Sequence, residues 1–384
     1  MRILLIGEYS RLHNSLKEGL EQLGHTVLLI GTGDGFKKFP VDIDIQSRLF
    51  EKWLLRKGRV LLYRLFGIDL CSIERGLRFY WAERNLESFD VVQLINENAI
   101  QASNYFEIFL VKRLRRKHKK LFLLSCGTDF ISVSYAYQKK LKYSMFTPYF
   151  EGLVKNELRY TYILKKINRS NKRLHSFLFQ QIDGVIASDL DYHIPLKGNK
   201  KYKGLIPNPV NISRFDFEAH DVSNKIIIFH GINSANYFSK GNYIFEKALK
   251  IIEEKHGDRV AVITTRDMPY TDYIEAYAQC DILMDQVFSY DQGYNALESM
   301  ARGKVVFTGA EQEFLDFYHL NKNQVCINAL PDIDSIVQEL ELLILEPTKI
   351  LDIGKAARNF VIENHQYVDI AKRYINVWQF VDSQ

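Results

Sequence analysis

The sequence contains few cysteines, and none of them is paired with another in a short motif. Four cysteines are spread over 384 residues without any Cys-x-x-Cys spacing. This arrangement argues against a zinc site and against a disulfide framework, and it fits a reducing compartment. We therefore expect a cytoplasmic protein.

Long apolar runs are missing as well. No run reaches the ~18 residues that a membrane-spanning helix needs. The charged, apolar and small-residue pattern of a signal peptide is also absent, because a strand-like apolar run follows Met1 directly. The chain has no internal repeat and no low-complexity tract. Its length favours two domains, and we expect it to be soluble or at most to lie on a membrane surface.

Charge is distributed unevenly along the chain. Residues 1–220 carry 36 Lys and Arg against 22 Asp and Glu, a net charge of +14, whereas residues 221–384 carry 15 against 24, a net charge of −9. The basic N-terminal half should therefore favour an anionic surface or acceptor, whereas the acidic C-terminal half should not bind nucleic acid nonspecifically. We expect membrane phospholipid or a phosphate-bearing acceptor rather than DNA.

Short apolar runs alternate with helical patterns through most of the chain. The first unit runs from Met1 to Gly31, with leucines at helical spacing between two apolar runs. Such strand-helix-strand units imply right-handed crossovers in a parallel sheet. Further apolar runs that we interpret as strands are 91–95, 121–125, 184–188, 225–230, 260–264, 282–285, 305–308 and 325–327.

A proline-containing turn divides this pattern into two series. Ile206-Pro-Asn-Pro-Val-Asn211 cannot continue a helix or a central strand. The sequence therefore predicts an α/β protein with two Rossmann-like, doubly wound domains facing each other across a cleft. We expect an N-terminal domain at 1–205, a C-terminal domain at 206–360, and a terminal helix at 361–384 that packs back on the first domain.

The most specific stretch is Asp285-Gln-Val-Phe-Ser-Tyr-Asp-Gln-Gly-Tyr-Asn-Ala-Leu-Glu-Ser-Met-Ala-Arg-Gly-Lys304. A strand ends at Asp285, and a loop containing Gly293 leads into a helix that carries Glu298. A helix N-terminus offers free N–H groups and a positive dipole end, which suit a pyrophosphate. A carboxylate farther along the helix can accept hydrogen bonds from a ribose, although Glu298 could also be only a solvated helix residue.

This stretch resembles the retaining glycosyltransferases of the GT-B fold (group 1, family 4-like) that act in bacterial surface-polysaccharide synthesis. Their C-terminal domains carry E-G-F-G-x-x-x-x-E-A-M-A-x-G. Gly293, Glu298, Met300-Ala301 and Gly303 match this motif, whereas Tyr290 stands at the first glutamate, which in the family helps to hold the donor sugar. The resemblance implies a nucleotide-sugar donor bound by Asp285, Tyr290, Gly293, Tyr294, Asn295 and Glu298.

Three other loops resemble the family's cleft. Ser10 and His13 follow the first strand, and Gly127 and Asp129 follow the strand at 121–125. The resemblance implies that Gly231 and Lys240 approach the donor diphosphate; Ile232 replaces a usual arginine, for which Arg266 could substitute. We predict catalytic roles for His13, Asp129 and Lys240. The alternatives are a helix-terminal histidine, a helix-capping aspartate and a surface lysine.

Other signals are weaker. Asp189-Leu-Asp191 and Asp332-Ile-Asp334 spell the D-x-D of metal-dependent glycosyltransferases, but acids at a helix start are favoured by the dipole alone. We expect no metal and no cofactor. The segment 53–66 mixes Trp, Leu and Phe with Arg and Lys, and 112–120 is rich in basic residues. Either could lie on an anionic membrane, or be a solvated helix face.

Together these features predict a glycosyltransferase that moves a sugar from a nucleotide donor to a saccharide or lipid-linked acceptor. The resemblance implies retention of the anomeric configuration. The alternatives are a nucleotide-sugar epimerase or hydrolase of the same fold, or a binding protein that has lost catalysis, for which Tyr290 is the argument.

Overall fold

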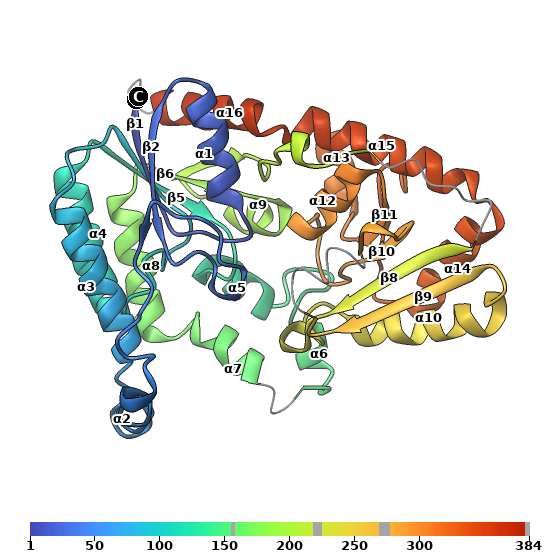
Figure 1. The fold of residues 1–384 in the computed structure, drawn as a ribbon, viewed down its shortest axis with the longest axis horizontal. Helices are drawn as coiled ribbons and strands as arrows, with labels where there is room; N and C mark the ends of the chain where they lie inside the picture. The colour runs from blue at the N-terminus through green and yellow to red at the C-terminus, as the bar shows by residue number, and fades with distance from the viewer. Residues whose placement is uncertain (155–157, 218–224, 269–276, 381–384) are drawn as a thin grey trace.

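The structure is a computed structural model that describes residues 1–154, 158–217, 225–268 and 277–380. Two separate parallel sheets organise the chain (Figure 1). The expected α/β architecture of two Rossmann-like domains is confirmed.

The N-terminal sheet has seven strands in the order β3-β2-β1-β4-β5-β6-β7. Helices α1 and α16 lie on one face, and α3, α4 and α8 on the other (Figure 1). The strands are β1 (Arg2–Ile6), β2 (Thr26–Gly31), β3 (Ile43–Asp44), β4 (Val91–Leu94), β5 (Lys120–Ser125), β6 (Gly184–Ala187) and β7 (Tyr202–Leu205). The helices are α1 (Leu12–Gln22), α2 (Trp53–Phe66), α3 (Leu70–Arg84), α4 (Asn104–Lys117), α5 (Phe130–Tyr137), α6 (Thr147–Phe150), α7 (Leu158–Lys165), α8 (Arg169–Gln181) and α9 (Leu190–Leu196).

The C-terminal sheet has five strands in the order β12-β11-β10-β8-β9. Its strands are β8 (Ile226–Ile232), β9 (Val260–Arg266), β10 (Ile282–Met284), β11 (Val305–Thr308) and β12 (Ile327–Asn328). The helices that follow are α10 (Asn242–His256), α12 (Tyr294–Arg302), α13 (Gln312–Tyr318), α14 (Ile333–Leu345), α15 (Thr348–His365) and α16 (Tyr367–Phe380).

Continuous apolar runs form the central strands because both faces of each sheet are covered by helices. All four residues of β4, β6 and β11 are buried.

Two boundaries differ from the sequence prediction. Strand β8 continues through Gly231, which pairs with Thr265 in the ladder, so Gly231 is a strand residue and not part of the following loop. The terminal helical segment is divided at Gln366 into α15 and α16.

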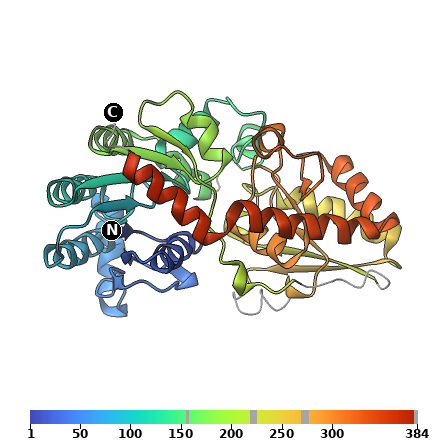
Figure 2. The same cartoon turned by 90° about the horizontal axis from the view of Figure 1, so that it is seen from above.

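The chain crosses between the domains twice, and the two crossings are joined. The backbone N–H of Val210 donates to His365 (2.7 Å), and that of Tyr367 donates to Val210 (3.1 Å). Helix α16 then lies across the N-terminal domain, as Figure 2 shows from above. Trp378 is fully buried there, and its indole Nε1 donates to Oε1 of Gln93 (3.2 Å). The two segments that cross between the domains are therefore joined to each other by backbone hydrogen bonds.

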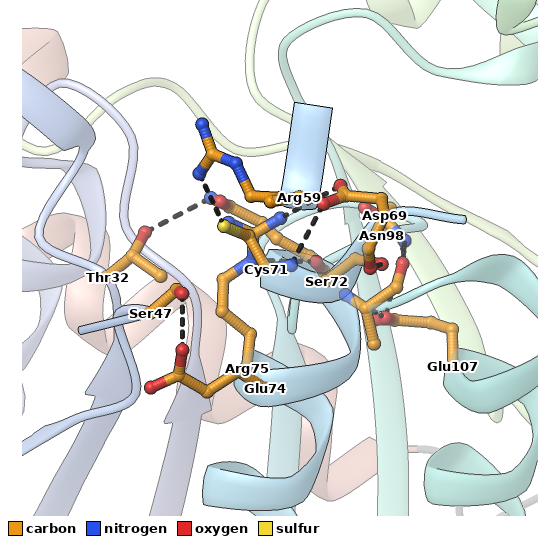
Figure 3. A network of polar contacts seen from close by, with 12 residues as sticks. Thr32, Ser47, Arg59, Asp69, Cys71, Ser72, Glu74, Arg75, Asn98 and Glu107 are labelled. Atoms are coloured by element: carbon orange, nitrogen blue, oxygen red, sulfur yellow. Dashed lines mark hydrogen bonds and ion pairs between the residues drawn. The ribbon is translucent and has the colours of Figure 1, made fainter. Parts of the chain in front are cut away.

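Helix α2 projects from the N-terminal domain (Figure 1) and buries none of its residues. A polar network fixes its base. Arg59 Nη1 contacts Cys71 Sγ of α3 at 2.7 Å, and Ser47 donates to Glu74 of α3 (Figure 3). Glu74 also accepts from three backbone N–H groups of residues 48–50. The exposed fractions of Trp53, Leu54 and Phe66 are 74%, 81% and 67%. Within the described ranges, no helix is long and apolar enough to cross a bilayer.

Candidate active site between the two domains

A cavity of about 280 Å³ lies where the two domains meet. The N-terminal domain contributes residues of α5, the 141–145 loop, Arg159 of α7, and Asp189, Asp191 and Tyr192 at the start of α9. The C-terminal domain contributes residues of the 236–240 and 286–293 loops. These segments follow the carboxyl ends of strands in both sheets, which is where open parallel sheets bind ligands.

Lys240 lines this cavity, and its ammonium is fixed by a buried carboxylate. Lys240 Nζ lies 3.0 Å from Asp285 Oδ1, with the lysine side chain 34% exposed and the aspartate 1% exposed. Asp285 also accepts from Asn295 Nδ2 (3.0 Å) and Thr308 Oγ1 (3.3 Å). The structure thus joins three predicted donor-binding residues. Asp285 therefore binds both Lys240, which lines the cavity, and Asn295, which does not.

Glu298 lies on α12, which begins directly after Gly293. Gly293 lines the cavity and has no side chain to accept from the first N–H groups of the helix. Burial raises the pKa of Glu298 to about 7, while Arg11, Lys37 and other cations oppose the shift. The nearby Arg11 and Lys37 belong to the loops after β1 and β2, so the Glu298 carboxylate faces the N-terminal domain. No hydrogen bond occupies it within the described chain.

The loop after β1 has a strained backbone. Ser10 and Arg11 have positive φ angles of 49° and 72°. The backbone N–H of Ser10 donates to Asp34 (2.8 Å), and its hydroxyl contacts Lys37 Nζ (2.9 Å). His13 is fully buried and bonds the carbonyl of Gly7 through Nδ1 (2.7 Å). Burial lowers the pKa of His13 to about 3, so the ring is neutral. It supports the loop from inside and does not face the cavity.

The loop after β5 carries the two other N-terminal residues that the sequence indicated. Gly127 has a φ of 65°, and a Cβ placed there would be 3.7 Å from the Tyr9 ring. Asp129 caps α5: its carboxylate accepts from the backbone N–H and the hydroxyl of Ser132, both at 2.7 Å, and from Ser125. Three donors therefore occupy a carboxylate that we expected to stabilise charge at the anomeric carbon. In this arrangement Asp129 caps the helix, which was the alternative to the predicted catalytic role.

Tyr290 holds the two domains together. Its hydroxyl accepts from the backbone N–H of Lys142 at 2.8 Å. Beside it, Glu311 of the C-terminal domain accepts from Tyr143 Oη and from Lys142 Nζ (2.8 Å), and within its own domain from Asn328 (2.9 Å). The residue at the family's first glutamate position therefore forms an interdomain contact. Tyr294 is also turned away from the cavity, because its hydroxyl donates to the carbonyl of Pro209 (2.8 Å).

Three carboxyls that line the cavity are not among the predicted donor-binding residues: Asp189 and Asp191 were discounted, and Asp291 was considered only as a substitute for the first glutamate of the motif. Asp189 caps α9, Asp191 accepts from Ser289 Oγ (2.5 Å), and Asp291 accepts from the backbone N–H of Leu190 (3.2 Å). Burial raises the pKa of all three, to about 6 for Asp191 and about 7 for Asp291. Their positions in the sequence, directly after β6 and shortly before α12, could have indicated that they lie at the carboxyl ends of strands. Within the ranges described, no three His, Cys, Asp or Glu side chains form a metal-binding group.

One further prediction needs correction, and one cavity residue was missed. Arg266 does not reach the cavity: its guanidinium pairs with Glu246 (2.8 Å) and stacks on Tyr237, with the side chain 49% exposed. It therefore does not supply the charge that Ile232 lacks. Arg159 lines the cavity and was not singled out from the sequence. It lies in a short helix of mixed basic and aromatic composition, which gave no signal.

Residues 246–376 match the family model described as glycosyl transferase-like, a range that runs from α10 into α16. No curated protein sequence matches the chain.

Solved structures match over the whole chain at low sequence identity. A sucrose-phosphate synthase from Thermosynechococcus elongatus aligns with a TM-score of 0.61 at 13% identity, covering 100% of this chain and 99% of that one. Anabaena HepE in complex with UDP-glucose gives 0.57 at 14% identity, with 100% of both chains covered. A glycosyltransferase from Rickettsia africae gives 0.54 at 14% identity, covering 100% of this chain and 98% of that one. The fold is therefore GT-B.

Proposed function

We propose that this protein transfers a sugar from a nucleotide-sugar donor to a saccharide or lipid-linked acceptor, with retention of configuration, in bacterial surface-polysaccharide synthesis. The observation that carries the proposal is the interdomain cavity. Lys240 and Gly293 line it, and the unoccupied carboxylate of Glu298 lies farther along α12. The glycosyl transferase-like match to residues 246–376 and the UDP-glucose bound by the HepE neighbour support the same reading.

The donor would lie mainly on the C-terminal domain. Glu298 would accept hydrogen bonds from the ribose, and Lys240 with the first N–H groups of α12 would bind the diphosphate. Near neutral pH, Glu298 is poised between its two protonation states because its pKa is about 7. Ionised, it can accept from both hydroxyls of the ribose.

In the reaction, the bond between the anomeric carbon and the diphosphate oxygen breaks, and its electron pair leaves with that oxygen. The acceptor oxygen bonds to the same face of the anomeric carbon and gives its proton to the departing diphosphate. Negative charge grows on the leaving group, so the fixed cation Lys240 stabilises the transition state. The interdomain contacts around Tyr290 and Glu311 exclude water from the closed cavity. We propose that no metal ion takes part, and activity retained in EDTA would support this.

The test is incubation with labelled nucleotide sugars, with and without lipid-linked or saccharide acceptors. Release of nucleotide that depends on acceptor supports transfer. A product formed without acceptor would instead indicate epimerisation or hydrolysis. Binding without turnover would indicate a protein that has lost catalysis, the outcome that Tyr290 at the first glutamate position keeps in view.

We also propose that the protein works at the cytoplasmic face of a membrane, held there by α2 together with α7. Helix α2 carries four basic residues and no acidic residue, and its apolar side chains are exposed. Lys165 of α7 contacts the hydroxyl of Tyr63 (3.3 Å), and Leu158 of α7 is 86% exposed. Basic residues near an anionic surface contribute about 1 kcal/mol each, and the apolar side chains add insertion into the lipid boundary.

Co-sedimentation with phosphatidylglycerol-containing vesicles at low salt tests this placement. We expect the wild type to bind these vesicles and not pure phosphatidylcholine vesicles. Replacing Leu54 and Phe66 by Ser should abolish binding, whereas Leu345→Ser, an exposed leucine of the C-terminal domain, should leave it unchanged. A soluble dimer held through α2, seen by light scattering, would contradict the membrane assignment.

A further inference from the structure

Of the residues that line the cavity, the C-terminal domain contributes one cation, Lys240. A nucleoside diphosphate carries more negative charge than one ammonium offsets, and Lys240 is already paired with Asp285 at 3.0 Å. Ile232, at the end of β8, offers no charge. The remaining positive charge must come from another segment of the chain.

The other cations near the domain contact already have partners. Arg11 pairs with Glu18 (2.7 Å), Lys37 with Asp34 (3.2 Å) and Lys142 with Glu311 (2.8 Å). Arg266 pairs with Glu246 away from the cavity. Each of these side chains would have to give up an ion pair to bind a phosphate.

Arg159 differs from all of them. It lines the cavity from α7, and its Nε is buried without a hydrogen-bond partner. Two acceptors on the opposite side, Asn236 Oδ1 and Gln292 Oε1, line the same cavity and are also buried without partners. Buried polar atoms are almost always hydrogen-bonded, so three unpartnered atoms around one cavity point to a polar ligand.

We propose that Arg159 binds the diphosphate of the nucleotide-sugar donor across the cavity from Lys240, and so supplies from the N-terminal domain the charge that Ile232 leaves out. This inference rests on the proposed function, because it assigns a further residue to the same donor. A guanidinium offers a planar pair of N–H donors to a phosphate, which a lysine cannot.

The position of Arg159 also couples the donor to domain closure. Lys240 and Gly293 belong to the C-terminal domain and Arg159 to the N-terminal domain, so the complete diphosphate site exists only when the domains meet. The carboxyls of Asp189 and Asp291 line the same cavity and suit sugar hydroxyls. A ligand with hydroxyls at one end and phosphates at the other therefore matches the mixed lining.

Calorimetric titration of the full-length protein with UDP, GDP and ADP, and with the corresponding monophosphates, tests the proposal. Arg159→Ala should weaken binding of the preferred diphosphate about ten- to hundredfold, since a charge-assisted hydrogen bond is lost. The monophosphate should change less than about threefold. Arg159→Lys should lie between these values. Arg173→Ala is the matched control, because Arg173 stacks on Tyr105 at the surface of α8.

The outcomes separate this inference from the proposed function. Equal diphosphate affinity in wild type and Arg159→Ala would overturn the role of Arg159 while leaving the donor site intact. Equal losses for the diphosphate and the monophosphate would overturn it too, since they would indicate a general disturbance of the fold. If the wild type binds none of the three diphosphates, the proposed function fails first and the inference with it.

Discussion

Glu311 joins the two domains through two side-chain contacts, and removing it should open the molecule. Its buried carboxylate accepts from Tyr143 and Lys142 of the N-terminal domain. A buried hydrogen bond to a charged group contributes about 1.5–3 kcal/mol. The ion pair adds at most about 1 kcal/mol, because the Lys142 side chain is 60% exposed and solvent screens it. Glu311→Ala should therefore cost the closed arrangement about 2–3 kcal/mol.

A loss of that size changes the ratio of closed to open molecules about 30- to 150-fold. Small-angle X-ray scattering of the free protein should give a larger radius of gyration for Glu311→Ala, and saturating nucleotide sugar should restore the compact value. Glu311→Gln keeps an acceptor for Tyr143 and should fall between the two. Glu346→Gln, which alters a surface ion pair with Lys349, is the control. If Glu311→Ala lowers the unfolding midpoint but leaves the radius of gyration unchanged, the reasoning is refuted.

Three further predictions follow from the described side chains. Burial raises the folded-state pKa of Asp291 to about 7, so the stability that its protonated form contributes is lost as the pH rises from about 4 through 7. Calorimetry should therefore show that Asp291→Asn raises the Tm by about 2–6 °C at pH 8 and leaves it unchanged at pH 5. Trp378→Ala should cost about 3–5 kcal/mol in urea unfolding, against less than about 0.5 for Phe380→Ala, whose ring is 72% exposed. Glu298→Gln should raise the KM for the donor about tenfold with kcat nearly unchanged, and wild-type donor affinity should fall as pH drops below about 7, because the ionised carboxylate is the better acceptor.

The fold was largely predictable from the sequence because its strands are buried on both faces. The central residues of β1, β5 and β11 are consecutive apolar residues and are buried, a pattern typical of parallel strands covered on both faces. The end of β8 was placed too early because Gly231 has the composition of a turn. Its ladder partner Thr265 lies more than thirty residues away, and no local pattern reveals that pairing.

The site was predictable where motifs that belong to the same domain lie together. Lys240, Asp285 and Asn295 were singled out, and they lie together in the structure. Residues whose role depends on the other domain were not predictable. Tyr290 contacts Lys142 across the interface, and Arg159 reaches the cavity from a helix with no motif. Asp189 was set aside because the helix dipole alone favours an acid at the start of α9, although Asp189 both caps that helix and lines the cavity.

The packing of α16 has a consequence for synthesis on the ribosome. Trp378 fills a fully buried position on the first domain, near the end of the chain, and Lys120 Nζ donates to its carbonyl (2.8 Å). The nascent N-terminal domain therefore lacks part of its packing until α16 has emerged. The apolar surface of α1 that α16 covers in the finished fold therefore stays exposed while the second domain is translated and folds.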